Sequence, residues 1–290
     1  MRRFSLAAAL VAGFVMVGAS ACADTILFVG NSFTFAAYSP VWHYHGETVT
    51  DLNAEGVGGV PALFKAFTRE AGLDYAVSLE TSPGKDLQFH IDHKTAVIDR
   101  AWDHVVLQSY STLDAAKPGD PAGLVRSAAT LARMFHDKNP RVDIRLMTTW
   151  SRADLTYRPA GHWYGKPIDA MEKQIRAGYD LAAAASPLIK GVIPVGDAWN
   201  RAFQTGFADP NPYDGIDAGK VDLWAFDNYH ASTFGYYIEA LMVFGAVTGR
   251  DPLVLGPREA CAAELGVSPA QAAAMQQIAH DELAAQTRRP

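Results

Sequence analysis

Cysteine is almost absent from the 290-residue chain, which contains only Cys22 and Cys261. Cys22 falls in an N-terminal segment that we expect to be removed or lipidated, so Cys261 is left without an intramolecular partner and no disulfide framework is expected. A chain of this length can bury a core without such cross-links. Because 49% of the residues are hydrophobic and 19% are charged, the composition is that of a globular domain.

Basic residues are also scarce, and the formal net charge is −6. They form no basic patch, so we expect no nucleic-acid partner. The apolar run at residues 6–17 is too short for a membrane span, and we expect no transmembrane helix there.

This apolar run instead predicts a secretory signal peptide at residues 1–23. It follows the basic Met1-Arg2-Arg3 and precedes Ala21-Cys22-Ala23, whose small residues suit a cleavage site. We therefore expect an exported protein, periplasmic or extracellular, with a single mature domain at residues 24–290. The alternative is lipid attachment at Cys22, although the bulky aliphatic residue usual in a lipoprotein signal is missing.

Several catalytic and cofactor motifs are missing as well. No Gly-x-Ser-x-Gly occurs, which excludes the nucleophile elbow of α/β-hydrolases. The glycine-rich residues 56–61 follow no hydrophobic strand and lack the Gly-Lys-Ser/Thr ending, so they are neither a dinucleotide fingerprint nor a P-loop. The pairs His43-x-His45 and His90-x-x-His93 lack the helical spacing of a zinc-protease site. We expect no metal and no cofactor.

What is present is an alternation of short apolar runs and helical patterns. The apolar runs lie at residues 26–29, 75–80, 104–108, 142–149 and 191–195. The helical patterns lie at residues 61–71, 87–102, 121–136, 168–185 and 233–247, with a C-terminal helix at about 268–286 that we expect to pack on the outside. This order predicts a mostly parallel five-stranded sheet covered by helices in one α/β domain.

Two distant segments carry candidate catalytic residues. The first predicted strand ends in Gly30-Asn31-Ser32, and ligands of parallel sheets bind beyond the carboxyl ends of the strands. Far along the chain, Asp227 and His230 are three positions apart, so that the carboxylate could orient the imidazole as a base for Ser32. Each segment alone has a simpler interpretation, because Gly-Asn-Ser is common in turns and Asp227 could cap a helix beside a surface histidine.

Taken together, these segments resemble the SGNH (GDSL-type) hydrolase superfamily, in the bacterial branch with Gly-Asn-Ser in its first block. The resemblance covers roughly residues 25–249. It implies a three-layer α/β/α flavodoxin-like sandwich, with Ser32 as the nucleophile, His230 as the base and Asp227 as its orienting group.

The middle blocks of the superfamily match less well. The resemblance implies an oxyanion hole made by the backbone N–H groups of Ser32 and a glycine of the second block, for which Gly84 is the best match and Gly58 or Gly59 the next. The third block normally supplies an asparagine, but this chain has Gln108 in its place, and we expect the longer amide to substitute for it.

The resemblance predicts a secreted serine esterase that forms an acyl-enzyme and removes acetyl groups from carbohydrates. Two alternatives remain open: a lipase or thioesterase for longer acyl chains, and a non-catalytic carbohydrate-binding or envelope protein that kept the fold. Loop residues could stack on sugar rings or line an acyl pocket, but packing against the core is the stronger expectation for each of them; they are Trp150, Arg152, Trp163, Tyr164 and Trp224.

Overall fold

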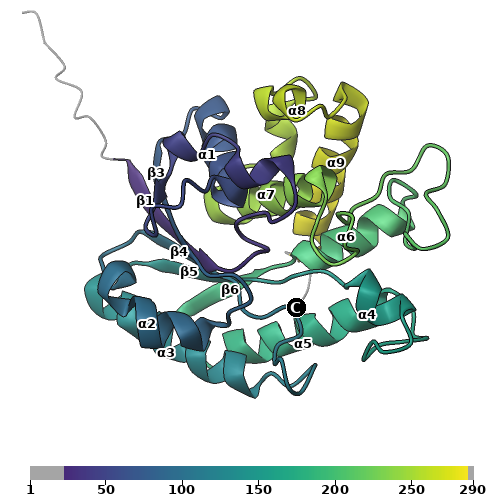
Figure 1. Ribbon diagram of the computed structural model, residues 1–290. Coiled ribbons are helices and arrows are strands. Elements are labelled where there is room, and N and C mark those ends of the chain that lie inside the picture. Colours follow the sequence, from purple (N-terminus) through teal and green to yellow (C-terminus); the bar gives the residue numbers. More distant parts are fainter. Residues whose placement is uncertain (1–22, 287–290) are drawn as a thin grey trace, which may run out of the picture.

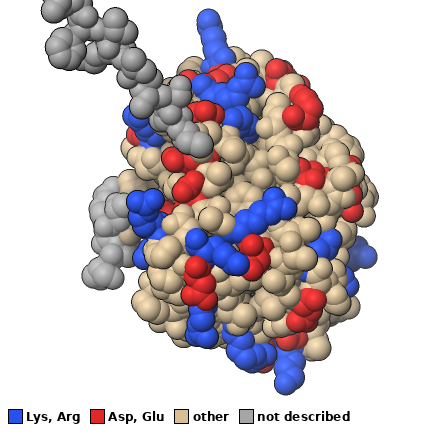
Figure 2. Space-filling view, turned by 90° about the vertical axis from the view of Figure 1, so that its left-hand side faces the viewer, with Lys and Arg blue, Asp and Glu red and all other residues tan. Residues whose placement is uncertain are grey.

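The computed structural model describes residues 23–286 (Figure 1). The predicted signal peptide, including Cys22, lies outside the described residues except for its last position. None of the helices within residues 23–286 has both the length and the apolarity to cross a bilayer. On the face drawn in Figure 2, lysine and arginine side chains are interspersed with aspartate and glutamate.

A six-stranded parallel sheet forms the middle layer, with the order β2-β3-β1-β4-β5-β6. β1 therefore lies inside the sheet, between β3 and β4. The strands are β1 (Asp24–Gly30), β2 (Thr50–Asp51), β3 (Tyr75–Thr81), β4 (His104–Leu107), β5 (Asp143–Met147) and β6 (Ile189–Ile193).

The expected parallel α/β architecture is confirmed, but the expected number of five strands is one too few. The additional strand is β2, a two-residue edge strand that pairs only with β3. Two residues are too short to produce an apolar run, so the sequence pattern gave no sign of this strand.

Helices cover both faces of the sheet (Figure 1). On one face lie α1 (Gly59–Glu70), α6 (Val195–Gln204), α7 (Thr233–Thr248), α8 (Ala260–Glu264) and α9 (Pro269–Gln286). On the other face lie α2 (Leu87–Ile98), α3 (Ala122–Lys138) and α5 (Asp169–Ala184), with the short α4 (Ala153–Tyr157) in the loop after β5.

β1 shows why its sequence is apolar without interruption. Ile26 and Phe28 pack into the core beneath α1 and α7, whereas Leu27 and Val29 pack into the core beneath α2 and α3. Side chains of a strand alternate between faces, so a strand covered on both sides must be apolar at every position.

Several helices differ from the sequence predictions: the short α4 and α8 were not expected, and two longer helices also differ. α6 was not anticipated, because it begins at Val195, directly after β6 and Pro194, where the apolar run was read as strand. α9 was expected to pack on the outside, but it buries Met275 and Ile278 in the core that α7 also lines. This C-terminal helix is therefore part of the domain's main hydrophobic core.

Candidate active site

The turn after β1 depends on a close approach at Gly30. A Cβ atom at this position would lie 2.2 Å from Thr34 Oγ1 and 2.8 Å from Gln108 Oε1, closer than real Cβ contacts. The absence of a side chain lets the backbone fold back so that Ala37 N–H donates to the Ser32 carbonyl at 3.0 Å. Ser32 is thereby held just beyond the carboxyl end of β1, where its side chain is nearly buried.

Asn31 fastens this turn to two neighbouring loops. Its Nδ2 donates to Lys85 O at 2.8 Å and to Ser109 O at 3.2 Å, while its Oδ1 accepts from Phe33 N–H at 3.2 Å. The side chain is 2% exposed, so these protein groups provide its hydrogen bonds. The residue before the candidate nucleophile therefore connects the ends of β1, β3 and β4.

Ser32, His230 and Asp227 form one continuous chain of hydrogen bonds. His230 Nε2 lies 2.9 Å from Ser32 Oγ, although the two residues are 198 positions apart in the sequence. His230 Nδ1 lies 2.6 Å from Asp227 Oδ2, and the His230 backbone N–H donates to Asp227 Oδ1 at 2.9 Å. The structure thus brings together the three residues that the sequence analysis selected.

A tight turn between Trp224 and Ala231 carries the acid and the imidazole. These two residues form an antiparallel bridge, and Ala225 N–H donates to the His230 carbonyl at 2.8 Å. Asn228 adopts the left-handed conformation at the tip of the turn, with φ of 55°; asparagine tolerates this conformation better than most residues. Asp227 and His230 therefore point to the same side.

Hydrogen bonding keeps Asp227 charged. Burial alone would raise the pKa of the Asp227 carboxyl, but hydrogen bonds from the His230 ring and from the backbone N–H groups of His230 and Tyr229 lower it below its ordinary value. An ionised Asp227 can accept the Nδ1–H of His230, which leaves the Nε2 lone pair directed at Ser32.

The structure corrects the role expected for Gln108. Its Oε1 accepts from Asn31 N–H and from Thr34 Oγ1, each at 3.0 Å, and its Nε2 donates to Ser109 O. The side chain is fully buried, so its amide lies beneath the turn and offers no donor to a substrate. Gln108 therefore supports the Gly30–Thr34 backbone.

Gly84 lies in the loop that adjoins the Ser32 turn. Ser82 N–H donates to the Gly30 carbonyl at 3.0 Å, and Asn31 binds the carbonyl of Lys85. Gly84 is exposed and adopts φ of 67°. Within residues 23–286 no acceptor takes up the backbone N–H of Ser32 or of Gly84, so both remain suitable as oxyanion donors.

The two alternative glycines have structural roles at the start of α1. Gly58 N–H donates to the Trp42 carbonyl at 2.9 Å, so this donor is already used. A Cβ atom on Gly59 would come within 2.8 Å of Phe35 Cα. Both glycines are explained by the close packing of α1 against the segment that follows Ser32.

Packing against the core is confirmed for the three loop tryptophans but is wrong for Tyr164, which is 54% exposed. Trp150, Trp163 and Trp224 are 0%, 1% and 2% exposed.

Two residues that the sequence analysis did not single out are exposed beside His230: Tyr38 at 54% and Phe226 at 80%. Their rings lie 5.1 Å apart, and the Tyr38 ring lies 5.0 Å from that of His230. Their only sequence signal is proximity, since Tyr38 follows Ser32 by six positions and Phe226 directly precedes Asp227.

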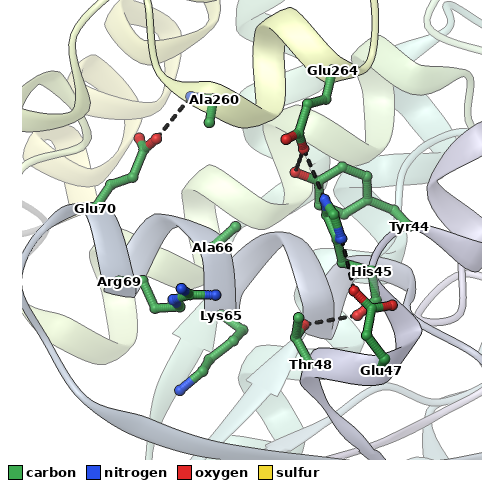
Figure 3. Close-up of a pocket in the computed structure, with 10 residues that line it drawn as sticks. All are labelled: Tyr44, His45, Glu47, Thr48, Lys65, Ala66, Arg69, Glu70, Ala260 and Glu264. Atoms are coloured by element: carbon green, nitrogen blue, oxygen red, sulfur yellow. Dashed lines mark hydrogen bonds and ion pairs between the residues drawn. The ribbon is translucent and has the colours of Figure 1, made fainter.

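The largest of three described cavities, about 500 Å³, lies elsewhere between α1, α8 and the segment around His45 (Figure 3). Figure 3 shows His45 between the carboxylates of Glu47 and Glu264. Its Nδ1 lies 2.9 Å from Glu47 Oε1, and its Nε2 lies 3.0 Å from Glu264 Oε2. These hydrogen bonds, that of Glu47 foremost, raise the pKa of His45.

Neither Ser32 nor His230 lines any of the three cavities. Residues 23–286 contain no group of acidic, histidine and cysteine side chains arranged to hold a metal ion.

Known proteins resemble this chain in structure rather than in sequence. No protein-family model matches it, and no curated protein matches its sequence. A DUF4886 family protein from Bacteroides uniformis matches with a TM-score of 0.61 at 18% identity, over 93% of this chain and 98% of that one. LAE5, an α/β hydrolase enzyme from the metagenome of Lake Arreo, matches with a TM-score of 0.52 at 17% identity, over 78% and 95% of the two chains.

A third solved structure carries the expected family description. A protein described as a GDSL-like lipase, from Parabacteroides merdae, matches with a TM-score of 0.53 at 16% identity, over 78% of this chain and 95% of that one. This structural match and the parallel sheet covered by helices on both faces confirm the architecture implied by the sequence resemblance. The chain therefore has the fold of the SGNH (GDSL-type) hydrolases.

Proposed function

We propose that this chain is an exported serine esterase that hydrolyses carboxylic esters through an acyl-enzyme, with an acylated carbohydrate as its substrate. The observation that carries the proposal is the continuous hydrogen-bond chain from Ser32 Oγ through His230 to Asp227. A serine is a weak nucleophile unless an adjacent base takes its proton. The fold agrees with this chemistry but does not specify it.

Acylation begins when Ser32 Oγ attacks the ester carbonyl carbon and its proton passes to His230 Nε2. The charge that develops on the carbonyl oxygen is met by the backbone N–H groups of Ser32 and Gly84, and such donors act without reorganisation during the reaction. The tetrahedral intermediate then loses the alcohol, whose oxygen takes the proton from Nε2 as the carbon–oxygen bond breaks.

Deacylation repeats the same steps with water. His230 removes a proton from the water that attacks the acyl-enzyme, and it returns this proton to Ser32 Oγ as the acid departs. Asp227 stays ionised throughout, fixes the tautomer of His230 and stabilises the imidazolium that forms in each half-reaction. No cofactor takes part in these steps.

A fluorophosphonate probe tests the proposal, because it labels only an activated serine. We expect the mature chain to be labelled at Ser32 and to hydrolyse p-nitrophenyl acetate, and we expect Ser32→Ala to lose both properties. Ser82→Ala is the matched control: Ser82 lies in the adjoining loop and is tied to Gly30 through its backbone alone, so labelling should persist. A folded wild-type chain that takes no label would instead support a non-catalytic binding protein.

A further inference from the structure

The exposed rings of Tyr38 and Phe226, together called the aromatic rim here, lie against the candidate base. Their ring planes meet at 66° with centroids 5.1 Å apart, and Tyr38 meets the His230 ring at 75°. With exposed fractions of 54% and 80%, they leave much apolar surface in water. Large exposed apolar groups beside a reactive centre point to a binding partner.

The backbone holds Tyr38 in this position. Tyr38 has φ of 62°, in the left-handed region that bulky residues avoid. Its neighbours are fixed on both sides: the carbonyl of Ala37 accepts from the Tyr236 hydroxyl at 3.3 Å, and Ser39 caps the short helix Pro40–His43. An unfavourable conformation at an exposed ring is typical of a residue that serves a ligand rather than the core.

The direction of proton transfer determines which part of the ester meets the rim. After acylation begins, His230 Nε2 must deliver its proton to the alcohol oxygen, so that oxygen has to lie within hydrogen-bond reach of this nitrogen. In the proposed mechanism the carbonyl oxygen is bound instead by the N–H groups of Ser32 and Gly84. In the proposed mechanism the alcohol portion therefore lies beside the His230 ring, whose centroid is 5.0 Å from that of Tyr38.

We propose that the aromatic rim selects the alcohol portion of the substrate, and that this portion is a pyranose ring. A pyranose combines an apolar C–H face, which packs on aromatic rings, with hydroxyl groups that need polar neighbours. Polar side chains are available close by, since Asn228 and Tyr229 follow Phe226 in the same turn and both are partly exposed. This inference rests on the proposed function, which already takes an acylated carbohydrate as substrate, and assigns the contact with its sugar ring to Tyr38 and Phe226.

The test compares two esters that share one acyl group and differ in the alcohol: an acylated methyl glucopyranoside and the corresponding ethyl ester. The acyl group is the one that the wild type hydrolyses fastest. We expect Phe226→Ala and Tyr38→Ala each to lower kcat/KM for the sugar ester by about three- to tenfold. The ethyl ester should lose less, because it has no ring to pack on the rim, so the ratio of the two kcat/KM values should fall by about threefold or more.

Three further variants separate ring contact from general effects. Tyr164→Ala removes a tyrosine with the same exposed fraction, 54%, from another loop and should leave both esters unchanged. Phe226→Trp should retain the sugar preference, whereas Phe226→Leu, which keeps apolar bulk without a ring, should lose it. Fluorophosphonate labelling should proceed at the wild-type rate in Tyr164→Ala and should persist in the Phe226 variants, which distinguishes a change in sugar selectivity from loss of the triad.

Three other outcomes would each contradict a stated part of the proposal. If the wild type hydrolyses neither ester and takes no label, the proposed function fails and the inference fails with it. If the wild type is labelled but the rim variants lose both esters equally, or neither, the triad stands and the selectivity is wrong. A hexyl ester that depends on the rim as strongly as the sugar ester would overturn the pyranose assignment.

Discussion

Asn31 shows how one side-chain amide can position the candidate nucleophile Ser32, its neighbour in the sequence, through hydrogen bonds to other residues. Its two Nδ2 hydrogen bonds reach the carbonyls of Lys85 and Ser109, on the loops after β3 and β4. A carboxylate of the same size has no hydrogens to donate to these carbonyls. The asparagine of the Gly-Asn-Ser block is therefore a structural requirement of this particular turn.

Replacing Asn31 with aspartate should destabilise the protein. The substitution places a negative charge beside two carbonyl oxygens at a site that is 2% exposed, with an expected loss of about 3 kcal/mol. That corresponds to a fall in Tm of about 6–12 °C at pH 7, measurable by circular dichroism. The loss should shrink at acidic pH, where the protonated carboxyl regains one donor; an equal loss at all pH values would contradict this explanation.

The site residues differ in how far sequence could reveal them. Ser32, Asp227 and His230 have side chains that catalyse ester hydrolysis only in combination. The Gly-Asn-Ser segment and the Asp-x-x-His pair together therefore already indicated a site. Tyr38 and Phe226 could not be told apart from the buried tryptophans, because exposure depends on a backbone path that no local pattern encodes. Gln108 was assigned the right place but the wrong role, since only coordinates show which way an amide points.

Among the structural elements, the turn that carries His230 is held by the loop after β5. Trp150 Nε1–H donates to the Tyr229 carbonyl at 3.1 Å, and the Trp150 ring is stacked on Trp199 with centroids 4.4 Å apart. Arg152 lies over the Tyr229 ring at 3.5 Å. The loop after β5 thus packs against the Trp224–Ala231 turn and supports it.

Removing the hydrogen bond from Trp150 should therefore displace His230. We expect Trp150→Phe to slow fluorophosphonate labelling of Ser32 by about tenfold, since small misplacements of catalytic groups have large effects on rate. Trp163→Phe is the matched control, because the Trp163 indole is also buried and donates to Gln174 at 2.9 Å, in the opposite core. Equal slowing in both variants would show that lost packing, rather than the bond to Tyr229, is responsible.

The element predictions failed where an apolar pattern did not change at a boundary. Val195 continues the apolar run of β6 but is already the first residue of α6, so only the helical geometry separates the two elements. The strand expected at residues 191–195 is found at Ile189–Ile193, so both expected ends lie two residues too far along the chain. Strands such as β1 were found correctly because Gly30 interrupts the apolar run.

At the scale of the whole molecule, stability should depend on a buried carboxyl between α5 and α6. Glu172 is 2% exposed and accepts a hydrogen bond from Asn200 Nδ2 at 2.7 Å. Burial raises the pKa of Glu172 to about 8, and the neighbouring Asp197 carboxylate adds to the rise. The folded state therefore favours the protonated form of this side chain.

A raised pKa in the folded state means that stability declines with increasing pH. The contribution of Glu172 is fully present below the unfolded pKa of about 4.3 and is lost as the pH rises to about 8, because the unfolded chain releases its proton first. We expect Glu172→Gln to reduce the fall in Tm between pH 5 and 9 (roughly the range of this transition) by several degrees. Glu55→Gln, at an exposed position, should leave the fall unchanged; a similar effect there would exclude Glu172 as the source.

The distance of 198 positions between Ser32 and His230 has a consequence for biosynthesis. Ser32 leaves the ribosome well before His230 has been translated. Any copy that stops short of the Trp224–Ala231 turn therefore carries a serine with no base beside it. If the proposed function holds, chains truncated before this turn should therefore hydrolyse no esters.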